Sequence, residues 1–399
     1  MPLSRIYHYH KIYRLFSTEL RLFELSVWLH VLARSMIAIF IPIFLLKIGY
    51  SVAEVMLYYF FLGVFNFPLN FFAKWLTRKI GARYVIIFGS ISLIAFFATL
   101  YNLTLNNWPL LITMAFFAAL YDALYWVAHI YFFIRCEKHD DNISKGVSFL
   151  YILKRIAGVL APIFGALILI FFKQKVLILI STIVLVLSIW PLFKIRYTHD
   201  KPSSKPIKLK SFFKGGKDIK EYILQGLCSF HNVSEGVIWP MFIFILFKTI
   251  ESVALIAVIV SVTTIIFTYF TGKIKKADRS KIMALGSLLI AIVWILRLVI
   301  DNNVFYYVSV FLIGLFSVLV SLPLDSSLFE KGEKKDALSA STYRNIFSMF
   351  PRMFFYGILF LLLNVFNVSF IVAAVSMFIV MAINYIFVLK SARSLKQTY

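Results

Sequence analysis

Long apolar runs separated by short polar segments dominate the pattern along the chain. The runs lie near 25–46, 54–73, 84–101, 109–133, 147–172, 176–193, 222–246, 253–271, 282–300, 304–324, 342–364 and 367–389. Each approaches the roughly 20 residues that an α-helix needs to cross a bilayer. Backbone amides in lipid need internal partners, so each run is predicted to be helical. The pattern therefore predicts an all-α integral membrane protein with about twelve transmembrane helices.

The basic residues are distributed unevenly between the segments that separate these runs. The chain carries a formal net charge of +23. With the N-terminus inside, 31 Lys and Arg fall in inward segments, whereas the outward loops hold only Lys47, Lys173, Lys175 and Lys248. This asymmetry predicts that both termini are cytoplasmic. A multi-pass protein of the plasma membrane is expected, the inner membrane in a prokaryote, and no nucleic-acid partner.

The longest polar stretch, 194–221, contains nine basic residues together with Pro, Ser and Gly, and it is interpreted as a cytoplasmic linker. The predicted organisation is an amphipathic N-terminal segment (1–23) on the membrane surface, a six-helix bundle (24–193), the linker, a second six-helix bundle (222–389) and a cytoplasmic tail (390–399). Weak repeats at an offset of 198, such as Pro42 with Pro240 and Arg83 with Lys281, favour gene duplication and a pseudo-twofold arrangement.

Charged residues deep in a predicted span are costly and are usually retained for a reason. Four lie about ten or more residues into their spans: Arg34, Asp122, Glu235 and Arg352. Lys154 and Arg155 lie at shallower depth. Two further arginines, Arg297 and Arg344, lie near span ends and are interpreted as anchors that reach toward the membrane surface.

Other polar and aromatic residues share helix faces with the deep charges. His30 precedes Arg34 by four residues, and His231 precedes Glu235 by four. The candidate substrate- or ion-binding residues are Arg34, Asp122, Tyr125, Trp126, His129, His231, Asn232, Glu235 and Arg352. The alternatives stay open: the acids and arginines form purely structural pairs, the histidines are packing residues, and the aromatics pack rather than form a substrate wall.

Several classes of site are not expected from the sequence. Cys136 and Cys228 have no partners at metal-ligand spacing, so neither a disulfide framework nor a metal site nor a cofactor is predicted. The acidic cluster His139-Asp140-Asp141 is interpreted as a solvated turn. Gly215-Gly216 is only a flexible pair, which disfavours an ATP-driven pump. The protein is expected not to be an enzyme.

Two motifs resemble the major facilitator superfamily. The loop from Lys74 to Arg83 reads KWLTRKIGAR, and it is similar to the family pattern Gly-x-Leu-x-Asp-Arg-x-Gly-Arg-Arg/Lys. Leu76, Lys79, Gly81 and Arg83 fit this pattern, whereas Arg78 stands where it has aspartate. The resemblance implies that these five residues belong to a gating loop. The fifth span contains Gly158, Pro162 and Gly165, which look like the Gly-Pro-x-x-Gly-Gly signature of proton-coupled exporters in the superfamily.

The resemblance implies alternating access, in which two bundles rock about a central site. A small-molecule substrate and protons are the expected partners, and the protein is expected to be monomeric. The fifth-span signature further suggests an exporter or antiporter. Asp122 and Glu235 are the first candidates for proton coupling, because a buried carboxyl group binds a proton more readily. His129 and His231 are the second. The rival interpretations are a non-transporting receptor or scaffold on the same fold and, less favoured, a lipid-modifying membrane enzyme.

Overall fold

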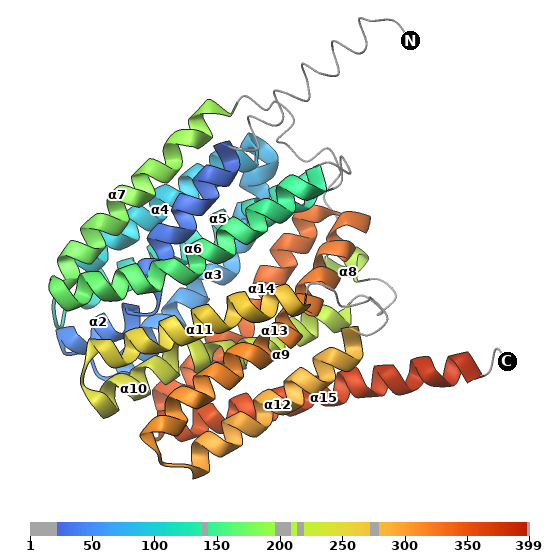
Figure 1. Ribbon diagram of the computed structural model, residues 1–399. Coiled ribbons are helices and arrows are strands. Elements are labelled where there is room, and N and C mark those ends of the chain that lie inside the picture. Colours follow the sequence, from blue (N-terminus) through green and yellow to red (C-terminus); the bar gives the residue numbers. More distant parts are fainter. Residues whose placement is uncertain (1–21, 138–142, 196–208, 214–218, 272–278, 397–399) are drawn as a thin grey trace, which may run out of the picture.

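The computed structural model describes residues 22–137, 143–195, 209–213, 219–271 and 279–396, and no strand occurs in these ranges. The predicted surface segment at the N-terminus and the His139-Asp140-Asp141 cluster lie outside them. Figure 1 shows long helices that run roughly side by side, and the dark-blue beginning and the dark-red end of the described chain lie on one side of the molecule. We call that side the terminal side.

Twelve helical rods make up the described structure, and this confirms the predicted fold class. The first rod is Leu22–Ile48, which ends in α2 (Ile41–Ile48). The others in the first half are α3 (Val52–Ile80), α4 (Ala82–Asn102), α5 (Trp108–Glu137), α6 (Ile143–Phe171) and α7 (Gln174–Lys194). After the short α8 (Leu209–Phe212), the second half contains α9 (Ile219–Val233), a π-helical turn (Ser234–Ile238) and α10 (Trp239–Phe247), then α11 (Ile250–Thr271), α12 (Arg279–Val299), α13 (Asn303–Lys334), α14 (Ala337–Leu361) and α15 (Val365–Lys396).

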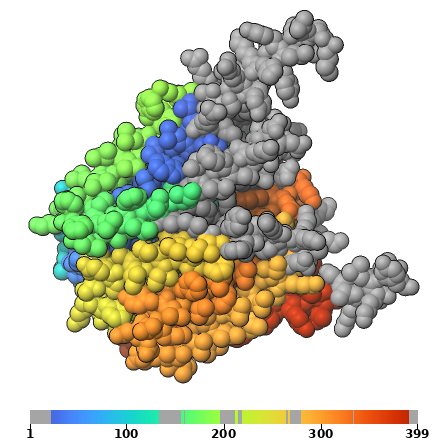
Figure 2. All heavy atoms as spheres, in the orientation of Figure 1, coloured from blue at the N-terminus to red at the C-terminus, as the bar shows by residue number. Residues whose placement is uncertain are grey.

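The rods form two bundles of six, one from each half of the chain. Figure 1 shows the first bundle from blue to green and the second from yellow-green to red. Two main seams join the bundles: α14 packs on α3 and α5, and α6 packs on α11. The second seam is visible at the surface, where the green α6 lies along the yellow α11 (Figure 2). Any cavity between the bundles is therefore flanked by these two seams.

Both bundles contain a helix that is interrupted at an equivalent proline. The first rod breaks before Pro42, and α10 begins after the π-helical turn with Pro240 near its first position. Proline lacks the amide hydrogen that would bond one turn back, so it is tolerated at the start of a helix rather than in its middle. The two prolines are the pair that the 198-residue offset relates. The sequence repeat thus corresponds to a repeated structural feature.

Polar side chains fix the points at which several helices begin. Ser51 and Glu54 form a reciprocal capping box at the start of α3. The Asn302 side chain accepts hydrogen bonds from two amides of α13, and the Asp336 side chain accepts one from α14. Such caps satisfy amides that have no partner within the helix. These caps fix where α3, α13 and α14 begin.

Small residues allow close approach where α3 packs on α14. A Cβ atom added to Gly63 would lie 2.6 Å from Cβ of Met353, so only glycine fits there. Near this contact, the rings of Tyr59 and Tyr356 stack at 4.9 Å. Close backbone approach maximises dispersion contacts between helices in a membrane, where burial of apolar surface contributes little. The seam therefore holds the two bundles together by close packing.

The two glycines of the fifth-span motif have different surroundings, and this gives a matched stability test. A Cβ atom on Gly165 would overlap the backbone carbonyl of Met36 in the first rod, whereas on Gly158 it would meet only Val31, at 3.9 Å. We expect Gly165→Ala to lower the free energy of unfolding by about 1–3 kcal/mol, because the two helices must separate. Gly158→Ala should be neutral or slightly stabilising, since alanine favours helix.

Thermal unfolding of both variants in detergent would check this contrast. Equal melting temperatures for the two alanine variants would contradict it. Pro162, the third residue of the motif, lies inside α6 between these glycines.

Candidate functional site

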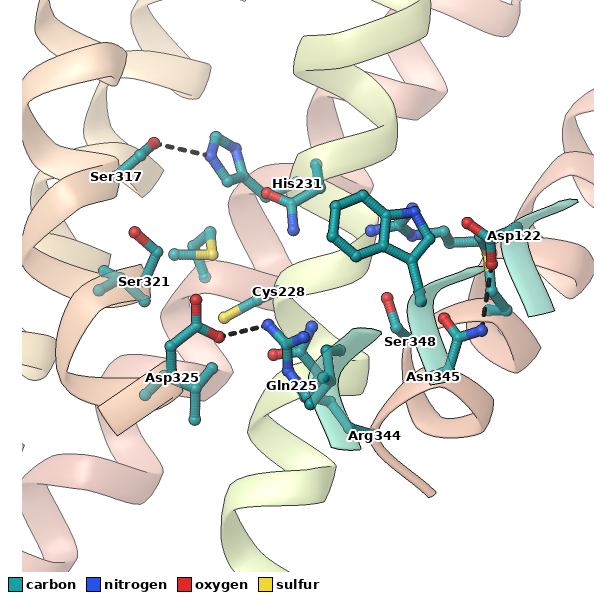
Figure 3. A pocket seen from close by; sticks show the side chains of 18 of the residues that line it. Asp122, Gln225, Cys228, His231, Ser317, Ser321, Asp325, Arg344, Asn345 and Ser348 are labelled. Atoms are coloured by element: carbon teal, nitrogen blue, oxygen red, sulfur yellow. Dashed lines mark hydrogen bonds and ion pairs between the residues drawn. The ribbon is translucent and has the colours of Figure 1, made fainter. Parts of the chain in front are cut away.

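A pocket of about 350 Å³ lies between the two bundles. The first bundle contributes residues from the first rod and α5, and the second contributes residues mainly from α9, α13 and α14. Pockets that bind small molecules in proteins commonly start at about this size. Six of the nine predicted binding residues line it: Arg34, Asp122, Trp126, His231, Asn232 and Arg352. Further lining residues that bear polar groups are Gln225, Cys228, Ser317, Ser321, Asp325, Arg344, Asn345 and Ser348, most of which are labelled in Figure 3.

Asp122 is the best-buried carboxylate of this pocket, with 8% of its surface exposed. Its Oδ2 atom accepts hydrogen bonds from Nδ2 of Asn66 at 3.0 Å and from Nδ2 of Asn345 at 3.1 Å. Asn70 completes the network, because it donates to Asn66 Oδ1 at 2.6 Å and accepts from Asn345 at 2.9 Å. The Asp122–Asn345 bond is drawn in Figure 3. Asp122 is therefore tied to α14 of the other bundle through amides rather than through an arginine.

Two arginines face the same pocket without forming a direct ion pair to any described residue. Arg34 lies with its guanidinium carbon 5.7 Å from the ring centres of Tyr121 and Trp126. Nε of Arg352 is buried and lacks a hydrogen-bond partner. Within the described residues, neither guanidinium group forms an ion pair or a hydrogen bond. Asp122 lies within electrostatic range of both, but one carboxylate cannot balance two partly buried cations, so the arrangement favours an anionic ligand between them.

Arg344 was predicted to be a surface anchor, and that prediction is wrong. Its Nη2 atom pairs with Oδ1 of Asp325 at 2.6 Å inside the pocket wall (Figure 3). The reason is helix length. α13 continues to Lys334, beyond the predicted span end at 324, and α14 already begins at Ala337. Both residues of the pair therefore lie within helices that border the pocket.

Arg297 was also predicted to be a surface anchor, and the structure contradicts this as well. Only 5% of its surface is exposed, and its Nη1 atom lies 2.5 Å from Oε2 of Glu235. Its Nε donates to Ser309, and its guanidinium carbon lies 3.6 Å from the ring centre of Trp239 and 4.5 Å from that of Trp294. The side chain stays inside the second bundle because it finds a carboxylate and two aromatic faces there. Glu235 is thereby neutralised, and it does not line the pocket.

Tyr125 and His129 lie behind the pocket wall rather than on it. The Tyr125 ring stacks between His30, at 3.7 Å between ring centres, and His129, at 5.4 Å. His30 also shares a hydrogen bond of 3.0 Å with the Tyr121 hydroxyl. All of these residues are buried. The aromatic face predicted on α5 is thus divided, with Trp126 on the pocket and the other rings packed inside the first bundle.

The loop between α3 and α4 reaches across to the second bundle on the terminal side. Nη2 of Arg78 lies 3.3 Å from Oδ2 of Asp336, the residue that caps α14. Lys74 adds a hydrogen bond of 3.4 Å to the Tyr343 hydroxyl. Arg78 occupies the position where the family pattern has an acid, and here the acid is supplied by the other bundle. The charged contact between the bundles thus pairs Arg78 of the first with Asp336 of the second.

The remaining loop residues shape the turn within the first bundle. Gly81 has a φ of 95°, a conformation that favours glycine, and it joins α3 to α4. Leu76 is half-buried and packs against the core. Lys79 lies over the ring of Trp75, whereas the Arg83 guanidinium bonds to the backbone carbonyl of Ile195 at the end of α7. Among the five predicted gating residues, Arg78 therefore makes the charged contact to the other bundle.

The Arg78–Asp336 pair can be tested through the native Cys228, which lines the pocket. Asp336→Asn should preserve the helix cap, since asparagine caps as well as aspartate, while it removes the charge. Loss of the pair removes about 1 kcal/mol of attraction between the bundles, so the pocket should open to solvent more often. In a Cys136→Ser background, we therefore expect N-ethylmaleimide to alkylate Cys228 roughly three- to tenfold faster.

Glu330→Gln is the matched control, because it breaks the Arg279–Glu330 pair inside the second bundle. It should leave the alkylation rate unchanged. An Asp336→Asn protein that reacts at the wild-type rate would show that this pair does not hold the pocket closed.

The sequence model of the Major Facilitator Superfamily matches residues 24–356, most of the chain. This protein belongs to the Major Facilitator Superfamily. No curated protein is detectably similar to it in sequence.

Solved structures of transporters share the fold of this superfamily member. A structure of a proton dependent oligopeptide transporter is 12% identical, with a TM-score of 0.68 over 95% of this chain and 100% of that chain. The human organic anion transporter MFSD10 (TETRAN) is 10% identical, with a TM-score of 0.67 over 92% and 99% of the two chains. A POT family transporter in complex with 5-aminolevulinic acid is 13% identical, with a TM-score of 0.66 over 94% and 95%. At these identities the likeness concerns the fold.

Several residues that form or support the pocket of this superfamily member were missed by sequence reasoning. Asn66, Asn70 and Asn345 carry the Asp122 network, yet they are uncharged. A signal was present, because Asn66 and Asn70 lie four residues apart in an apolar span, and a buried amide is costly without a partner. On α13, Ser317, Ser321 and Asp325 recur every four residues and form one face.

Proposed function

We propose that this protein is a proton-coupled secondary transporter of a small anionic solute, which it moves by alternating access. The observation that carries the proposal is the pair of guanidinium groups, Arg34 and Arg352, which face the pocket with no direct ion pair in the described part of the chain and share the single carboxylate of Asp122. Two arginines suit a carboxylate or a phosphate, because guanidinium groups bind such oxygens with strong charge-assisted hydrogen bonds.

Asp122 is the proposed proton-binding group. It shares the pocket with both arginines, and it is held by neutral amides, so protonation does not break an ion pair. A substrate anion and an ionised Asp122 repel each other in this confined space. Protonation of Asp122 therefore favours anion binding, and the two bind together. The electrostatics support symport of the anion with a proton.

Exchange of solute against protons is the second candidate, and the fifth-span signature with Gly158, Pro162 and Gly165 favours it. The two candidates differ in the sign of the pH dependence. In symport, lowering the pH strengthens anion binding, because the neutral carboxyl no longer repels the anion. In antiport, lowering the pH weakens binding, because the proton and the solute compete.

The proposed placement in the membrane follows from the charges. We propose that both termini are cytoplasmic, that the protein lies in the plasma membrane, and that the bundles extend over 24–193 and 222–389 with the linker 194–221 between them. On this placement the Arg78–Asp336 pair closes the cytoplasmic side of the pocket.

A thermal-shift screen of the purified protein would test the proposal. The panel contains acetate, lactate, citrate, inorganic phosphate and glycerol 3-phosphate, with glycerol and glucose as neutral controls, each at two pH values. We expect at least one anion to stabilise the wild-type protein, and more strongly at the lower pH. Arg352→Gln should abolish that stabilisation, whereas Arg279→Gln, outside the pocket, should retain it. Stabilisation by the neutral compounds alone would contradict the proposal.

A further inference from the structure

One wall of the pocket is backed by a chain of hydrogen bonds that leads into the second bundle. Nε1 of Trp294 donates to Nδ1 of His231 at 2.9 Å. Nε2 of His231 lies 3.1 Å from Oγ of Ser317, as the dashed line in Figure 3 shows. His231 and Ser317 line the pocket, whereas Trp294 is fully buried behind them.

The direction of these bonds is fixed by chemistry. An indole N–H can only donate, so Nδ1 of His231 must be an acceptor and carries no proton. The remaining nitrogen, Nε2, then carries the hydrogen of the neutral ring and donates it to Ser317. The Ser317 oxygen accepts this hydrogen bond. The hydroxyl hydrogen of Ser317 is therefore available to donate to a group in the pocket, which Ser317 lines. The chain therefore runs from the bundle interior toward the solute.

A buried ion pair holds the first member of this chain in place. The Arg297 guanidinium carbon lies 4.5 Å from the ring centre of Trp294, and Arg297 is itself fixed by Glu235. Glu235 lies in the π-helical turn that directly follows α9, four residues after His231. Extra turns of this type inside α-helices often mark functional sites. Here the turn carries Glu235, which pairs with Arg297, and Arg297 in turn packs against the indole ring of Trp294.

The charges around His231 disfavour a second proton on its ring. The charged side chains that line the pocket with His231 are Arg34, Asp122, Asp325, Arg344 and Arg352, and the Arg297–Glu235 pair lies behind Trp294. Asp325 pairs with Arg344 and Glu235 pairs with Arg297, so among these described residues the charged groups left without a direct ion pair are Arg34, Arg352 and Asp122, with one positive charge in excess. A nearby positive charge opposes the formation of imidazolium. These surroundings favour the neutral form of the His231 ring, although the sequence had made His231 a candidate proton carrier.

We propose that Trp294, His231 and Ser317 form a neutral donor relay, and that the Ser317 hydroxyl binds an oxygen acceptor on the transported solute. The relay lies on the second bundle, whereas Arg34 contributes its cation from the first. The solute is then a small organic acid or phosphate ester with a second oxygen function, a carbonyl or hydroxyl, set apart from its anionic group. This assignment of the solute rests on the proposed function, and the relay itself does not.

The relay is tested by the tautomer of His231, measured in protein labelled with ¹⁵N-histidine and assigned with His231→Gln. We expect an unprotonated Nδ1 and a protonated Nε2 throughout the range from about pH 5 to 8, where an ordinary histidine titrates. Trp294→Phe should allow His231 to titrate in that range. Trp126→Phe, which alters the same pocket from α5, should not. A wild-type ring that titrates, or that carries its hydrogen on Nδ1, overturns the relay.

The solute contact is tested with the anion that gives the largest thermal shift in the panel above. Ser317→Ala should weaken its binding by about three- to tenfold, and Ser317→Thr should restore it, because threonine retains the hydroxyl. Unchanged binding by Ser317→Ala overturns this contact while the proposed function stands. If no anion of the panel binds the wild-type protein, the proposed function and the solute contact both fail, and the tautomer still decides the relay.

Discussion

Arg297→Met is expected to lower the free energy of unfolding by about 3–5 kcal/mol, because it leaves a carboxylate buried without its partner. Arg297 is 5% exposed and lies 2.5 Å from Glu235. Methionine fills a similar space but cannot compensate the charge. The loss also removes the cation from its position over the Trp239 and Trp294 rings.

Unfolding by sodium dodecyl sulfate in mixed micelles would measure this effect. The double variant Glu235→Gln, Arg297→Met should recover much of the stability, since replacement of both partners removes the uncompensated charge. The matched control is Arg279→Met, which breaks a half-exposed pair at the helix ends and should cost about 0–1 kcal/mol. Similar losses for Arg297→Met and Arg279→Met would show that Arg297 reaches water, as the sequence first suggested.

The fold was largely predictable because lipid imposes few choices on a chain. Backbone groups in the bilayer need internal partners, so long apolar runs in a chain without a barrel pattern become helices. The runs near 25–46 and 304–324 correspond to Leu22–Ile48 and α13. The repeated prolines, Pro42 and Pro240, indicated the relation between the halves, and each lies in the first turn of a new helical segment.

The site was less predictable, because depth along a span does not specify which way a side chain points. Arg34, Asp122 and Arg352 were found by depth and do line the pocket. Glu235 met the same criterion, yet it points into its own bundle, where Arg297 satisfies it. The difference depends on helix rotation and on the π-helical turn, neither of which hydropathy records.

Errors at span ends had a second cause. Distance from the end of an apolar run was used as a measure of access to water, but helices continue beyond the run. α13 extends to Lys334, well past the predicted end at 324, so Asp325 and Arg344 meet within the protein. Uncharged polar residues such as Asn345 were missed because depth in a span marks only charged residues and their neighbours on the same helix, such as Asn232.

Asp122→Asn is expected to abolish solute accumulation driven by a proton gradient, while passive exchange of the solute continues. The substituted amide side chain retains an oxygen that accepts from Asn66 and Asn345, so the network between the bundles is preserved. This neutral amide resembles a permanently protonated carboxyl group. At neutral pH the variant should therefore bind the anion at least about tenfold more tightly than the wild type, because the repulsion from Asp122 is lost. Its affinity should no longer depend on pH.

Proteoliposomes separate these effects, with the anion of the thermal-shift screen as the transported probe. Uphill uptake under an imposed pH gradient reports coupling, and exchange of labelled for unlabelled anion reports the movement of the loaded carrier. Glu235→Gln is the control, since Glu235 is neutralised by Arg297 and does not line the pocket. That variant should remain coupled despite lower stability. If Glu235→Gln loses coupling and Asp122→Asn keeps it, the proton is carried within the second bundle, and the arginine pocket serves the solute alone.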